Sequence, residues 1–269
     1  MHKHSLSIVT YNNSVEQLSA LYRSISNSTL GLKAVIIDNS SNSDIESITK
    51  SYGFTYINPG VNLGFGKAHN IAINYSIQEN SKYHIIVNPD ITFPEDTIEK
   101  LVSVLEQDKS IGILMPRVCY PNGDFQFLCK KLPSPFNLII RRFIPFKALK
   151  DKLNVKYELQ ELDYSIQQEV PTISGCFLIS PTSVLQEMGG FDERFFMYLE
   201  DVDLTRRVGM KYKVVYSPEA TVYHEYAKDS YKNYKLLKYH ISSAIKYFNK
   251  WGWIFDKNRI TKNRIHETH

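Results

Sequence analysis

The hydrophobic and polar positions of the first 116 residues follow two alternating periods. Short apolar runs predict buried strands, and between them apolar residues recur at the i, i+3, i+4 spacing of a helix face. The expected strands are 5–10, 33–38, 54–58, 83–88 and 111–116, and the expected helices are 14–25, 44–52, 66–78 and 95–107. Strands that alternate with helices of this length predict an α/β fold with a doubly wound, mostly parallel central sheet.

The pattern becomes mixed after Pro116. Residues 117–128 predict a β-hairpin, because Asn122-Gly123 is a favoured turn pair, and residues 130–165 are predicted to be irregular. Further strands are expected at 170–180, 213–217 and 221–225, and helices at 182–188, 200–210 and 231–249. Since no linker divides the two halves, we predict a single domain over residues 1–269.

Composition narrows the class of protein. The chain is 43% hydrophobic and 22% charged, which suits a globular protein with its own core and excludes a mainly disordered one. No apolar run reaches the roughly 18 residues of a membrane span, and the first 13 residues predict a strand rather than a signal peptide. Cys119, Cys129 and Cys176 lack metal-ligand spacing, which is typical of reduced thiols in a cytoplasmic protein.

The basic residues are concentrated in two segments that are also rich in aromatic and aliphatic residues. The net charge is +4, yet residues 130–150 carry six basic residues and no acid, and residues 246–264 carry six and one acid. Such segments favour peripheral binding to an anionic membrane surface. The alternative is that Trp251, Trp253 and Phe255 pack the last helix onto the core. Nucleic acid is not expected as a partner, because the rest of the chain is net negative and contains no nucleic-acid-binding motif.

Polar clusters follow four of the expected strands. Ligands of open α/β sheets bind beyond the carboxyl ends of the strands. The clusters are Thr10-Tyr11-Asn12-Asn13, Asp38-Asn39-Ser40-Ser41, Asn58 with the loop after it, and Asn88-Pro89-Asp90. Each cluster alone is also compatible with a helix cap or a turn. Four of them in succession predict a binding site.

A loop with two glycines precedes the helix expected at 66–78. Gly64 and Gly66 permit close backbone approach, and a helix N-terminus attracts phosphate. The dinucleotide-binding pattern is not met, because His69 stands where its third glycine belongs, and no P-loop Gly-Lys-Ser/Thr follows. The loop therefore predicts neither an NAD site nor an ATPase.

Two further sets of residues are candidates for chemistry. Asp90 at a strand end suits a divalent cation that bridges two phosphates, although it is also compatible with a turn cap, and His224 is a candidate second ligand. Glu200 and Asp201 begin an expected helix, where the helix dipole also favours acidic residues for structural reasons. Asp203 is expected to pair with the arginines at 206–207.

Taken in order, these motifs resemble family-2 glycosyltransferases, and most of all the rhamnosyltransferase branch that builds bacterial surface polysaccharides. The segments that carry the resemblance are 10–12, 36–41, 62–70, 88–90, 174–180, 189–208 and His224, within about residues 5 to 250. The resemblance implies a GT-A fold, a sugar-nucleotide donor, a Mg²⁺ or Mn²⁺ ion and inversion at the anomeric carbon. Residues 1–116 would then be the nucleotide-binding half, 117–250 the metal and acceptor half, and 251–269 a basic aromatic tail.

The resemblance also implies roles for individual residues. Asp201 would be the general base with Glu200 beside it, and Asp90 and His224 would hold the metal. The donor nucleotide would be bound by Thr10, Tyr11, Asn12, Asp38, Asn39, Asn62, Gly64, Gly66 and Asn88. The acceptor side of the pocket would be lined by Ser174, Gly175, Cys176, Phe196 and Tyr198. Asn88 replaces the first acidic residue of the family's D-x-D element, which leaves fewer charged metal ligands.

We therefore predict an inverting, metal-dependent glycosyltransferase on the cytoplasmic face of the cell membrane. It would move L-rhamnose from dTDP-rhamnose to a lipid-linked glycan of O-antigen, capsule or another surface polysaccharide. UDP-hexose and UDP-galactofuranose are alternative donors. A nucleotidyltransferase is disfavoured, because residues 10–14 are not the glycine-rich basic loop that grips a triphosphate. A non-catalytic sugar-nucleotide or glycan-binding module is the alternative from another class.

Overall fold

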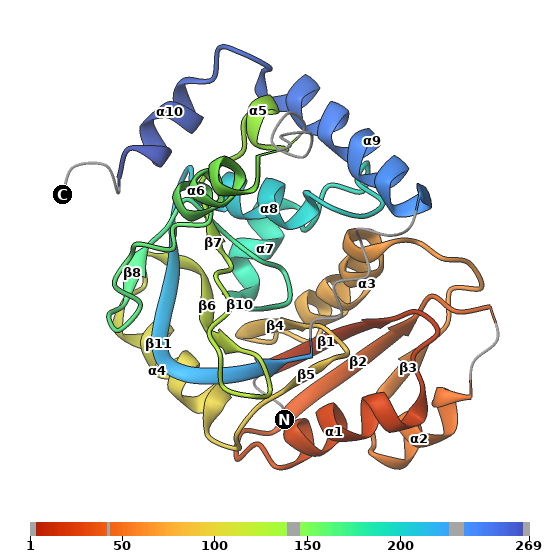
Figure 1. Cartoon of the computed structure of the whole chain (residues 1–269). Helices are drawn as coiled ribbons and strands as arrows, with labels where there is room; N and C mark the ends of the chain where they lie inside the picture. The colour runs from red at the N-terminus through yellow and green to blue at the C-terminus, as the bar shows by residue number, and fades with distance from the viewer. Residues whose placement is uncertain (1–3, 42–43, 139–145, 226–233, 266–269) are drawn as a thin grey trace.

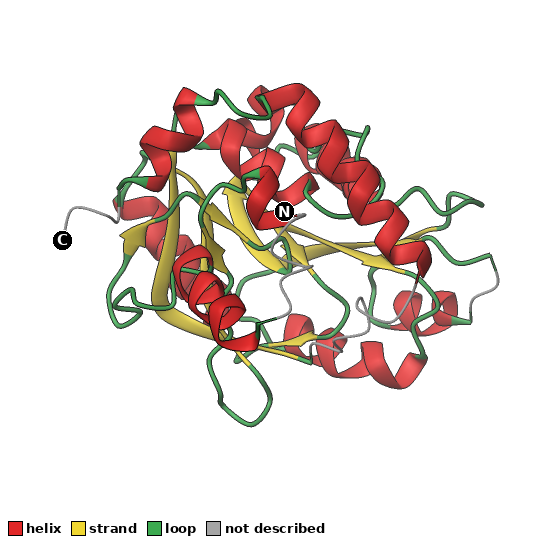
Figure 2. Ribbon diagram, turned by 45° about the horizontal axis from the view of Figure 1, so that its top comes forward, coloured by secondary structure: helices red, strands yellow, loops and turns green. Residues whose placement is uncertain are grey.

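A central sheet with helices on both faces forms the body of the protein (Figures 1 and 2). The structure is a computed structural model, and it describes residues 4–41, 44–138, 146–225 and 234–265. Among these residues, no helix is long and apolar enough to cross a membrane.

The first half alternates strand and helix as the sequence predicts. The strand order β3-β2-β1-β4 is parallel throughout. The elements are β1 His4–Thr10, α1 Val15–Ser26, β2 Leu32–Asp38, α2 Ile45–Ser51, β3 Thr55–Ile57, α3 Phe65–Gln78 and β4 Tyr83–Val87. Each begins and ends within a residue of its predicted range, because every one of them carries its own apolar period.

Helix α1 shows how directly the local sequence sets these elements. The Oγ of Ser14 accepts a hydrogen bond from the Gln17 N–H at 3.3 Å, and the Gln17 side chain accepts one from the Ser14 N–H at 3.0 Å. This reciprocal capping box satisfies N–H groups that a helix start otherwise leaves unpaired. The face with Leu18, Leu21 and Ile25 is buried against the sheet.

The second half continues the sheet with mixed strand directions, as predicted. The order is β4-β10-β6-β11-β5, with β10 antiparallel to its neighbours, β6 and β11 parallel, and β8 paired to β11. The strands are β5 Ile91–Thr92, β6 Ile111–Cys119, β7 Cys129–Lys130, β8 Gln168–Glu169, β9 Thr172–Ile173, β10 Phe177–Pro181 and β11 Lys213–His224. The helices are α4 Thr97–Gln107, α5 Pro135–Leu138, α6 Lys147–Tyr157, α7 Thr182–Met188, α8 Glu200–Val208, α9 Tyr234–Trp251 and α10 Lys257–Asn263.

Several predicted elements of this half are wrong in extent. The segment expected to be irregular contains α5 and α6, whose helical period is too weak to detect in the sequence. The single strand expected at 170–180 is broken between β9 and β10, and the strands expected at 213–217 and 221–225 form one strand, β11, with a register shift. The expected hairpin is reduced to an isolated antiparallel bridge between Cys119 and Phe125 around a turn at Gly123.

Parallel pairing gathers the polar strand ends at one edge of the sheet. Thr10 is the register partner of Asp38, and Ile8 is that of Val87, so Asn88 follows at the same edge. Strand β5 then pairs with β11 and places Ile91 opposite His224. The fold thereby brings residues from distant parts of the chain to one site.

A buried polar network crosses the core beneath this edge. The Nδ1 of His84 hydrogen-bonds the hydroxyls of Ser5 and Ser76 at 2.8 and 2.6 Å, and its Nε2 hydrogen-bonds Ser7 at 2.9 Å. Ser7 also hydrogen-bonds Nδ1 of His69 at 2.8 Å. Burial lowers the pKa of His84 to about 3, and burial with the nearby His84 lowers that of His69, so both imidazoles are neutral in the core.

Candidate active site

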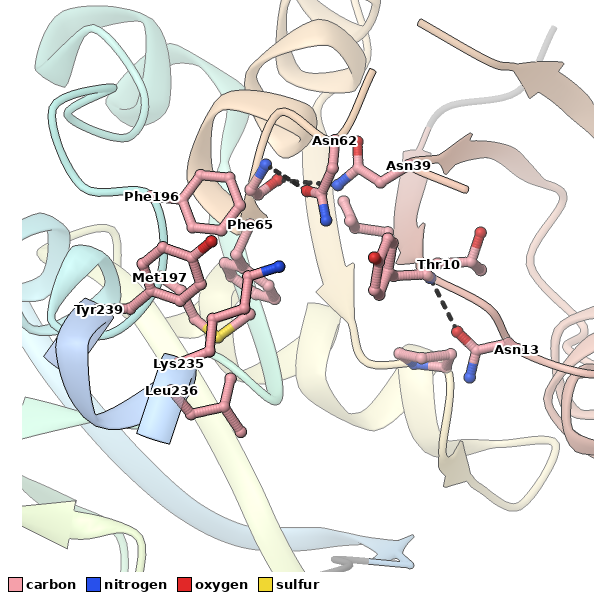
Figure 3. Close-up of a pocket in the computed structure, with 14 residues that line it drawn as sticks. Thr10, Asn13, Asn39, Asn62, Phe65, Phe196, Met197, Lys235, Leu236 and Tyr239 are labelled. Carbon is pink, nitrogen blue, oxygen red and sulfur yellow. Dashed lines mark hydrogen bonds between the residues drawn. The ribbon is translucent and has the colours of Figure 1, made fainter. Parts of the chain in front are cut away.

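A pocket of about 440 Å³ opens beyond the carboxyl ends of β1 and β2, where Figure 3 shows α9 on its opposite side. This is the edge at which open α/β sheets bind ligands. The pocket is lined by Val9, Thr10, Tyr11, Asn13, Asn39, Asn62, Gly64, Phe65, Pro89, Phe196, Met197, Lys235, Leu236 and Tyr239. Several residues predicted to bind the donor or the acceptor thus line the same pocket, although they lie far apart in the sequence.

Asp38 supports the pocket wall at Thr10 from behind. Its side chain is fully buried and accepts hydrogen bonds from the Thr10 hydroxyl at 3.1 Å, the Tyr56 hydroxyl at 2.9 Å and the Ser40 N–H at 3.0 Å. Asp38 does not belong to the lining of the pocket. These contacts fix the ends of β1 and β2 relative to each other, whereas Thr10 itself faces the cavity.

The turn after β1 presents Tyr11 to the pocket. Asn12 adopts a left-handed φ of 56° and donates its N–H to the Ser40 hydroxyl at 2.7 Å. The side chain of Asn13 accepts the Tyr11 N–H at 3.0 Å, and the Tyr11 side chain is 54% exposed. Asparagine tolerates this conformation because its short polar side chain can hydrogen-bond locally.

Two asparagines hold the glycine loop. The Nδ2 of Asn39 donates to the Gly64 carbonyl at 3.1 Å, and its Oδ1 accepts the Leu63 N–H at 3.2 Å. The Oδ1 of Asn62 accepts the Gly64 N–H at 2.9 Å. The loop after β3 is therefore fastened to the end of β2, and both asparagines also line the pocket.

The glycines of this loop admit a neighbouring segment of the chain. A Cβ on Gly64, whose φ is +80°, would lie 2.1 Å from the Phe196 carbonyl oxygen. A Cβ on Gly66 would lie 2.8 Å from the Cβ of Phe191. The sequence-based interpretation gave these glycines a role in backbone approach to phosphate. The structure shows that they are needed for packing against the segment before α8.

Helix α8 starts from a strained backbone. Tyr198 and Leu199 have φ values of 70° and 66°, in the left-handed region that non-glycine residues rarely adopt. Tyr198 packs its ring on His240 of α9 at a centroid distance of 5.3 Å and lies outside the pocket lining. Strain of this kind persists where the surrounding structure over-determines it, and here it lies directly before Glu200 and Asp201, the first residues of α8.

The two adjacent carboxyl groups have different surroundings. The Asp201 carboxylate accepts backbone N–H groups from Gly175 at 2.9 Å and Val202 at 2.8 Å. Burial raises the pKa of Asp201, and these N–H groups oppose that shift. Burial and the neighbouring Asp201 raise the pKa of Glu200 well above its ordinary value, and no hydrogen bond from the described residues reaches its buried Oε2. The geometry therefore favours an ionised Asp201 beside a neutral Glu200.

Asp90 and His224 lie side by side. The Asp90 Oδ1 and the His224 Nε2 are 3.3 Å apart, and the other ring nitrogen of His224 hydrogen-bonds the Gln126 side chain at 3.1 Å. The Asp90 carbonyl accepts the N–H of Glu225 at 3.0 Å, which locks the strand end that carries His224. The described residues contain no group of three or more acidic, histidine or cysteine side chains suited to a metal. A cation here would thus take only two such ligands from them.

Cys176 connects the two acidic sites. Burial raises the pKa of its thiol to about 12, and the charges of Asp90 and Asp201 act in the same direction. The Cys176 carbonyl accepts the Asn88 N–H at 2.8 Å, and its own N–H is donated to the Ser174 hydroxyl at 3.3 Å. The break between β9 and β10 therefore contacts both acidic segments, since the Gly175 N–H reaches Asp201 and the Cys176 carbonyl holds Asn88, two residues before Asp90.

Helix α9 supplies pocket residues that the sequence analysis missed. Lys235, Leu236 and Tyr239 line the cavity, and Tyr239 packs on Phe196 with ring centroids 4.7 Å apart. The sequence signal for these residues was the amphipathic pattern of the last predicted helix, and such a pattern does not show which surface the inner face of the helix packs against.

The expected pairing of Asp203 is only half correct. Arg207 pairs with Asp203 at 2.8 Å, but Arg206 pairs with the buried Asp256 instead. Arg206 points to the start of α10 because Asp256, Asn258 and the Tyr247 hydroxyl accept its hydrogen bonds there.

Comparison with known proteins identifies the family. The model of Glycosyl transferase family 2 matches residues 5–187, which is more than half of the chain. The chain belongs to this family. The matched range of this glycosyltransferase contains the pocket residues from Val9 to Pro89, Asp90 and Cys176, and it ends before Glu200, Asp201 and His224.

Curated relatives of this glycosyltransferase are similar at modest identity. The low-salt glycan biosynthesis hexosyltransferase Agl10 of Haloferax volcanii is 28% identical over 204 residues, which cover 76% of this chain and 60% of that protein. The N-acetylglucosaminyl-diphospho-decaprenol L-rhamnosyltransferase of Mycobacterium tuberculosis is 29% identical over 185 residues, or 62% and 57%. Rhamnosyltransferase WbbL of Escherichia coli K12 is 25% identical over 240 residues, or 86% and 85%. The match thus spans roughly three fifths of the first two relatives.

Solved structures share the fold. GalNAc-T7 with UDP, GalNAc and Mn²⁺ superposes with a TM-score of 0.63 at 14% identity, over 97% of this chain and 54% of that one. The mannosyltransferase PcManGT of Pyrobaculum calidifontis, with GDP-Man and Mn²⁺, gives 0.57 at 16% identity, over 91% and 64%. At these identities the likeness shows the fold alone, and it confirms the predicted GT-A architecture.

Proposed function

We propose that this family 2 glycosyltransferase moves a sugar from a nucleotide donor to a hydroxyl of a lipid-linked glycan, with inversion at the anomeric carbon. One observation carries the proposal. The turn at Gly175-Cys176 hydrogen-bonds both Asp201 and Asn88, which stands two residues before Asp90, and the neighbouring backbone of the two acidic sites, at Pro89 and at Phe196 and Met197, lines the 440 Å³ pocket. This arrangement offers a proton acceptor and a cation site next to space for a nucleotide sugar.

Asp201 acts as the general base. Inverting transfer is a single displacement, in which one carboxylate accepts the proton of the acceptor hydroxyl, an effect of roughly 10²–10⁴-fold in rate. The N–H groups of Gly175 and Val202 hold Asp201 in place and favour its ionised form. Glu200, favoured as the neutral acid by its raised pKa, does not compete for the proton.

Asp90 and His224 fit a Mg²⁺ or Mn²⁺ ion. A carboxylate oxygen and an imidazole nitrogen 3.3 Å apart are close enough to share one cation, and the Asp90 Oδ1 accepts no hydrogen bond from the described residues. When bound, such a cation stabilises the negative charge of the departing diphosphate. His224 is oriented for this by the hydrogen bond to Gln126, which fixes its ring.

The metal assignment is tested by nucleotide binding. Asp90→Asn should remove the dependence of UDP or dTDP affinity on added Mn²⁺ in titration calorimetry, and His224→Ala should weaken it less strongly. Full transfer activity of the purified protein in excess EDTA would contradict the assignment.

We propose L-rhamnose from dTDP-rhamnose as the transferred sugar. Two relatives are named rhamnosyltransferases, and one is named a hexosyltransferase, so UDP-hexose and UDP-galactofuranose remain as the alternatives. The test is a panel of nucleotide sugars with Mg²⁺ or Mn²⁺, scored by the shift in melting temperature and by release of the nucleoside diphosphate. We expect dTDP-rhamnose to give both signals. A response to UDP-sugars alone would overturn the rhamnosyl assignment, and binding without any turnover would favour a non-catalytic module.

We place the acceptor at the cytoplasmic face of an anionic membrane, in O-antigen, capsule or other surface-polysaccharide synthesis. The loop between α9 and α10 exposes Trp253, Ile254 and Phe255 by 40%, 75% and 93%. On α9, Ile241 and Ile245 are each 43% exposed, while the inner face of the same helix lines the pocket. A membrane contact on the outer face would present a lipid-linked glycan beside the site.

Parts of the sequence-based membrane prediction have different outcomes. Arg141 and Arg142 lie outside the described residues. Trp251 is partly buried and donates its indole N–H to Asp203 at 2.8 Å, so this tryptophan does pack the last long helix onto the core. Trp253 also packs its ring on the buried Phe248, with centroids 5.2 Å apart, as the packing alternative expects; its exposed part and Phe255 keep the membrane role as a proposal.

Liposome sedimentation tests the membrane contact. Replacing Ile254 and Phe255 with serine should reduce co-sedimentation with anionic vesicles at low salt, because these side chains supply the apolar contact. Ile166→Ser and Met210→Ser change residues that are 54% and 60% exposed elsewhere, and they should leave it unchanged. Failure of the unmodified protein to bind anionic vesicles would sink the membrane proposal and favour a soluble acceptor.

A further inference from the structure

Among the described residues of the pocket there is one charged side chain, to which the base and metal assignments give no role. Among the described residues that line the cavity, Lys235 alone carries a charge. Figure 3 shows its side chain extending from α9 into the cavity, toward the wall formed by Thr10, Asn39 and Asn62. One wall thus offers hydroxyl and amide groups, and the other offers an ammonium group.

Contacts along α9 hold Lys235 in this place. One turn further along the helix, Tyr239 packs on Phe196 with ring centroids 4.7 Å apart. The Ser243 hydroxyl donates to the Met197 carbonyl at 2.8 Å. The helix is therefore fixed to the same segment that leads to the candidate base, and this places the backbone of Lys235 at the pocket, into which its exposed side chain extends.

We infer that Lys235 is the cation that binds a diphosphate in this pocket. The inference rests on the proposed function, which brings a diphosphate from two sources, the nucleotide donor and the lipid-linked acceptor. A lysine ammonium binds phosphate as a compact point charge, and charge-assisted hydrogen bonds of this kind are about twice as strong as neutral ones. Pro89, which precedes Asp90, lines the same cavity, so the segment that carries the metal candidate borders the space into which Lys235 extends.

Titration calorimetry on the full chain tests the inference. The probes are UDP, dTDP and farnesyl diphosphate, with uridine and thymidine as ligands that lack phosphate. Lys235→Met keeps the length of the side chain and removes its charge. Lys238→Met is the matched control, because Lys238 is exposed on the same helix and does not line the pocket. We expect Lys235→Met to weaken diphosphate binding by at least about tenfold, and to leave nucleoside binding and the control unchanged.

The pattern of affinities distinguishes the sources. Weakening of UDP or dTDP assigns Lys235 to the donor diphosphate, and weakening of farnesyl diphosphate alone assigns it to the acceptor. Equal affinities of Lys235→Met and the unmodified protein for every diphosphate overturn the inference and leave the proposed function standing, and so does equal weakening of nucleosides and diphosphates. An unmodified protein that binds none of the diphosphates overturns both.

Discussion

At the scale of single residues, the adjacent carboxyl groups of Glu200 and Asp201 differ in protonation because their hydrogen bonds differ. Asp201 accepts two backbone N–H groups, and Glu200 keeps a buried oxygen that no described residue hydrogen-bonds. The difference assigns the proton to Glu200 and the negative charge to Asp201. Burial raises the pKa of both carboxyl groups, so this small difference decides which one is available as a base.

Substitution of Asp201 tests this division of roles. Asp201→Asn should keep the fold and the affinity for the nucleoside diphosphate, and should lower kcat at least about 10²-fold, since only proton acceptance is lost. Steady-state transfer and calorimetry on the same preparation check the two halves of the prediction. Near-native transfer by Asp201→Asn, together with inactivity of Glu200→Gln, would show that the other carboxylate is the base.

The pH dependence of the unmodified enzyme follows from the same residue. A base must be ionised, and the pKa of Asp201 is raised above its ordinary value by burial. Transfer should therefore be lost as the pH falls through that raised pKa, and should be retained above it. A profile of kcat/KM against pH measures this limb.

Position 64 requires glycine, because the backbone of Phe196 leaves no room for a side chain there. Alanine at Gly64 would strain a φ of +80° and press its Cβ to 2.1 Å from the Phe196 carbonyl. Gly53 is the matched control, because it has a φ of +74° and nothing within 4 Å of a built Cβ. Both alanine substitutions carry the conformational cost of about 1 kcal/mol or more, and Gly64→Ala should lose additional stability from the clash. Urea unfolding measures the difference, and equal losses would contradict the close contact.

At the scale of elements, α9 is anchored to α8 through one buried carboxylate. Asp203 has no exposed side-chain surface and pairs with Arg207 at 2.8 Å and Lys250 at 2.7 Å, and it accepts the Trp251 indole N–H at 2.8 Å. Because α9 carries the Lys235 side of the pocket, this anchor also determines the shape of the site.

Removing that charge should be costly. Asp203→Asn takes a buried charged partner from two partly buried cations, and because Lys250 also pairs with Asp192, the loss of unfolding free energy should stay below the value of about 3–5 kcal/mol for a fully buried pair. Asp96→Asn removes a carboxylate from an exposed pair with Lys100 and should cost less than about 1 kcal/mol. Chemical denaturation of both variants checks the ratio, and a similar small effect for the two would show that Asp203 is not an anchor.

At the scale of the whole molecule, stability should depend on pH through the buried histidines. His84 has a pKa of about 3 in the folded state, below the ordinary value of 6.5, because burial disfavours its charged form. The unfolded chain therefore binds more protons at mildly acid pH. The contribution of His84 to the stability of the fold is complete above about pH 6.5 and is lost as the pH falls toward 3.

Denaturation at pH 7.5, 6 and 5 measures this loss. As the pH falls through that window, each histidine that is neutral in the folded state lowers the unfolding free energy by up to about 1.4 kcal/mol per pH unit. His84→Gln, which does not titrate, should be less stable at pH 7.5 and should show a flatter dependence on pH. An unchanged slope in His84→Gln would mean that other groups dominate acid unfolding.

The sequence by itself determined the elements whose signals are local. The apolar periods of the first half set β1 to β4 and α1 to α3, and Ser14 with Gln17 set the start of α1. The polar strand ends also followed, because parallel strands must bring their carboxyl ends to one edge. These features depend on residues a few positions apart, so a single chain without its fold already contains them.

Only the tertiary structure decided which distant residues meet. Pairing of β5 with β11 sets His224 3.3 Å from Asp90, and the break at Gly175 sets a backbone N–H on Asp201. Packing of α9 on the segment before α8 brings Lys235 into the pocket. No local pattern encodes these contacts, because each depends on the free energy of packing whole elements together, and an amphipathic helix face shows that it will be buried without showing against what.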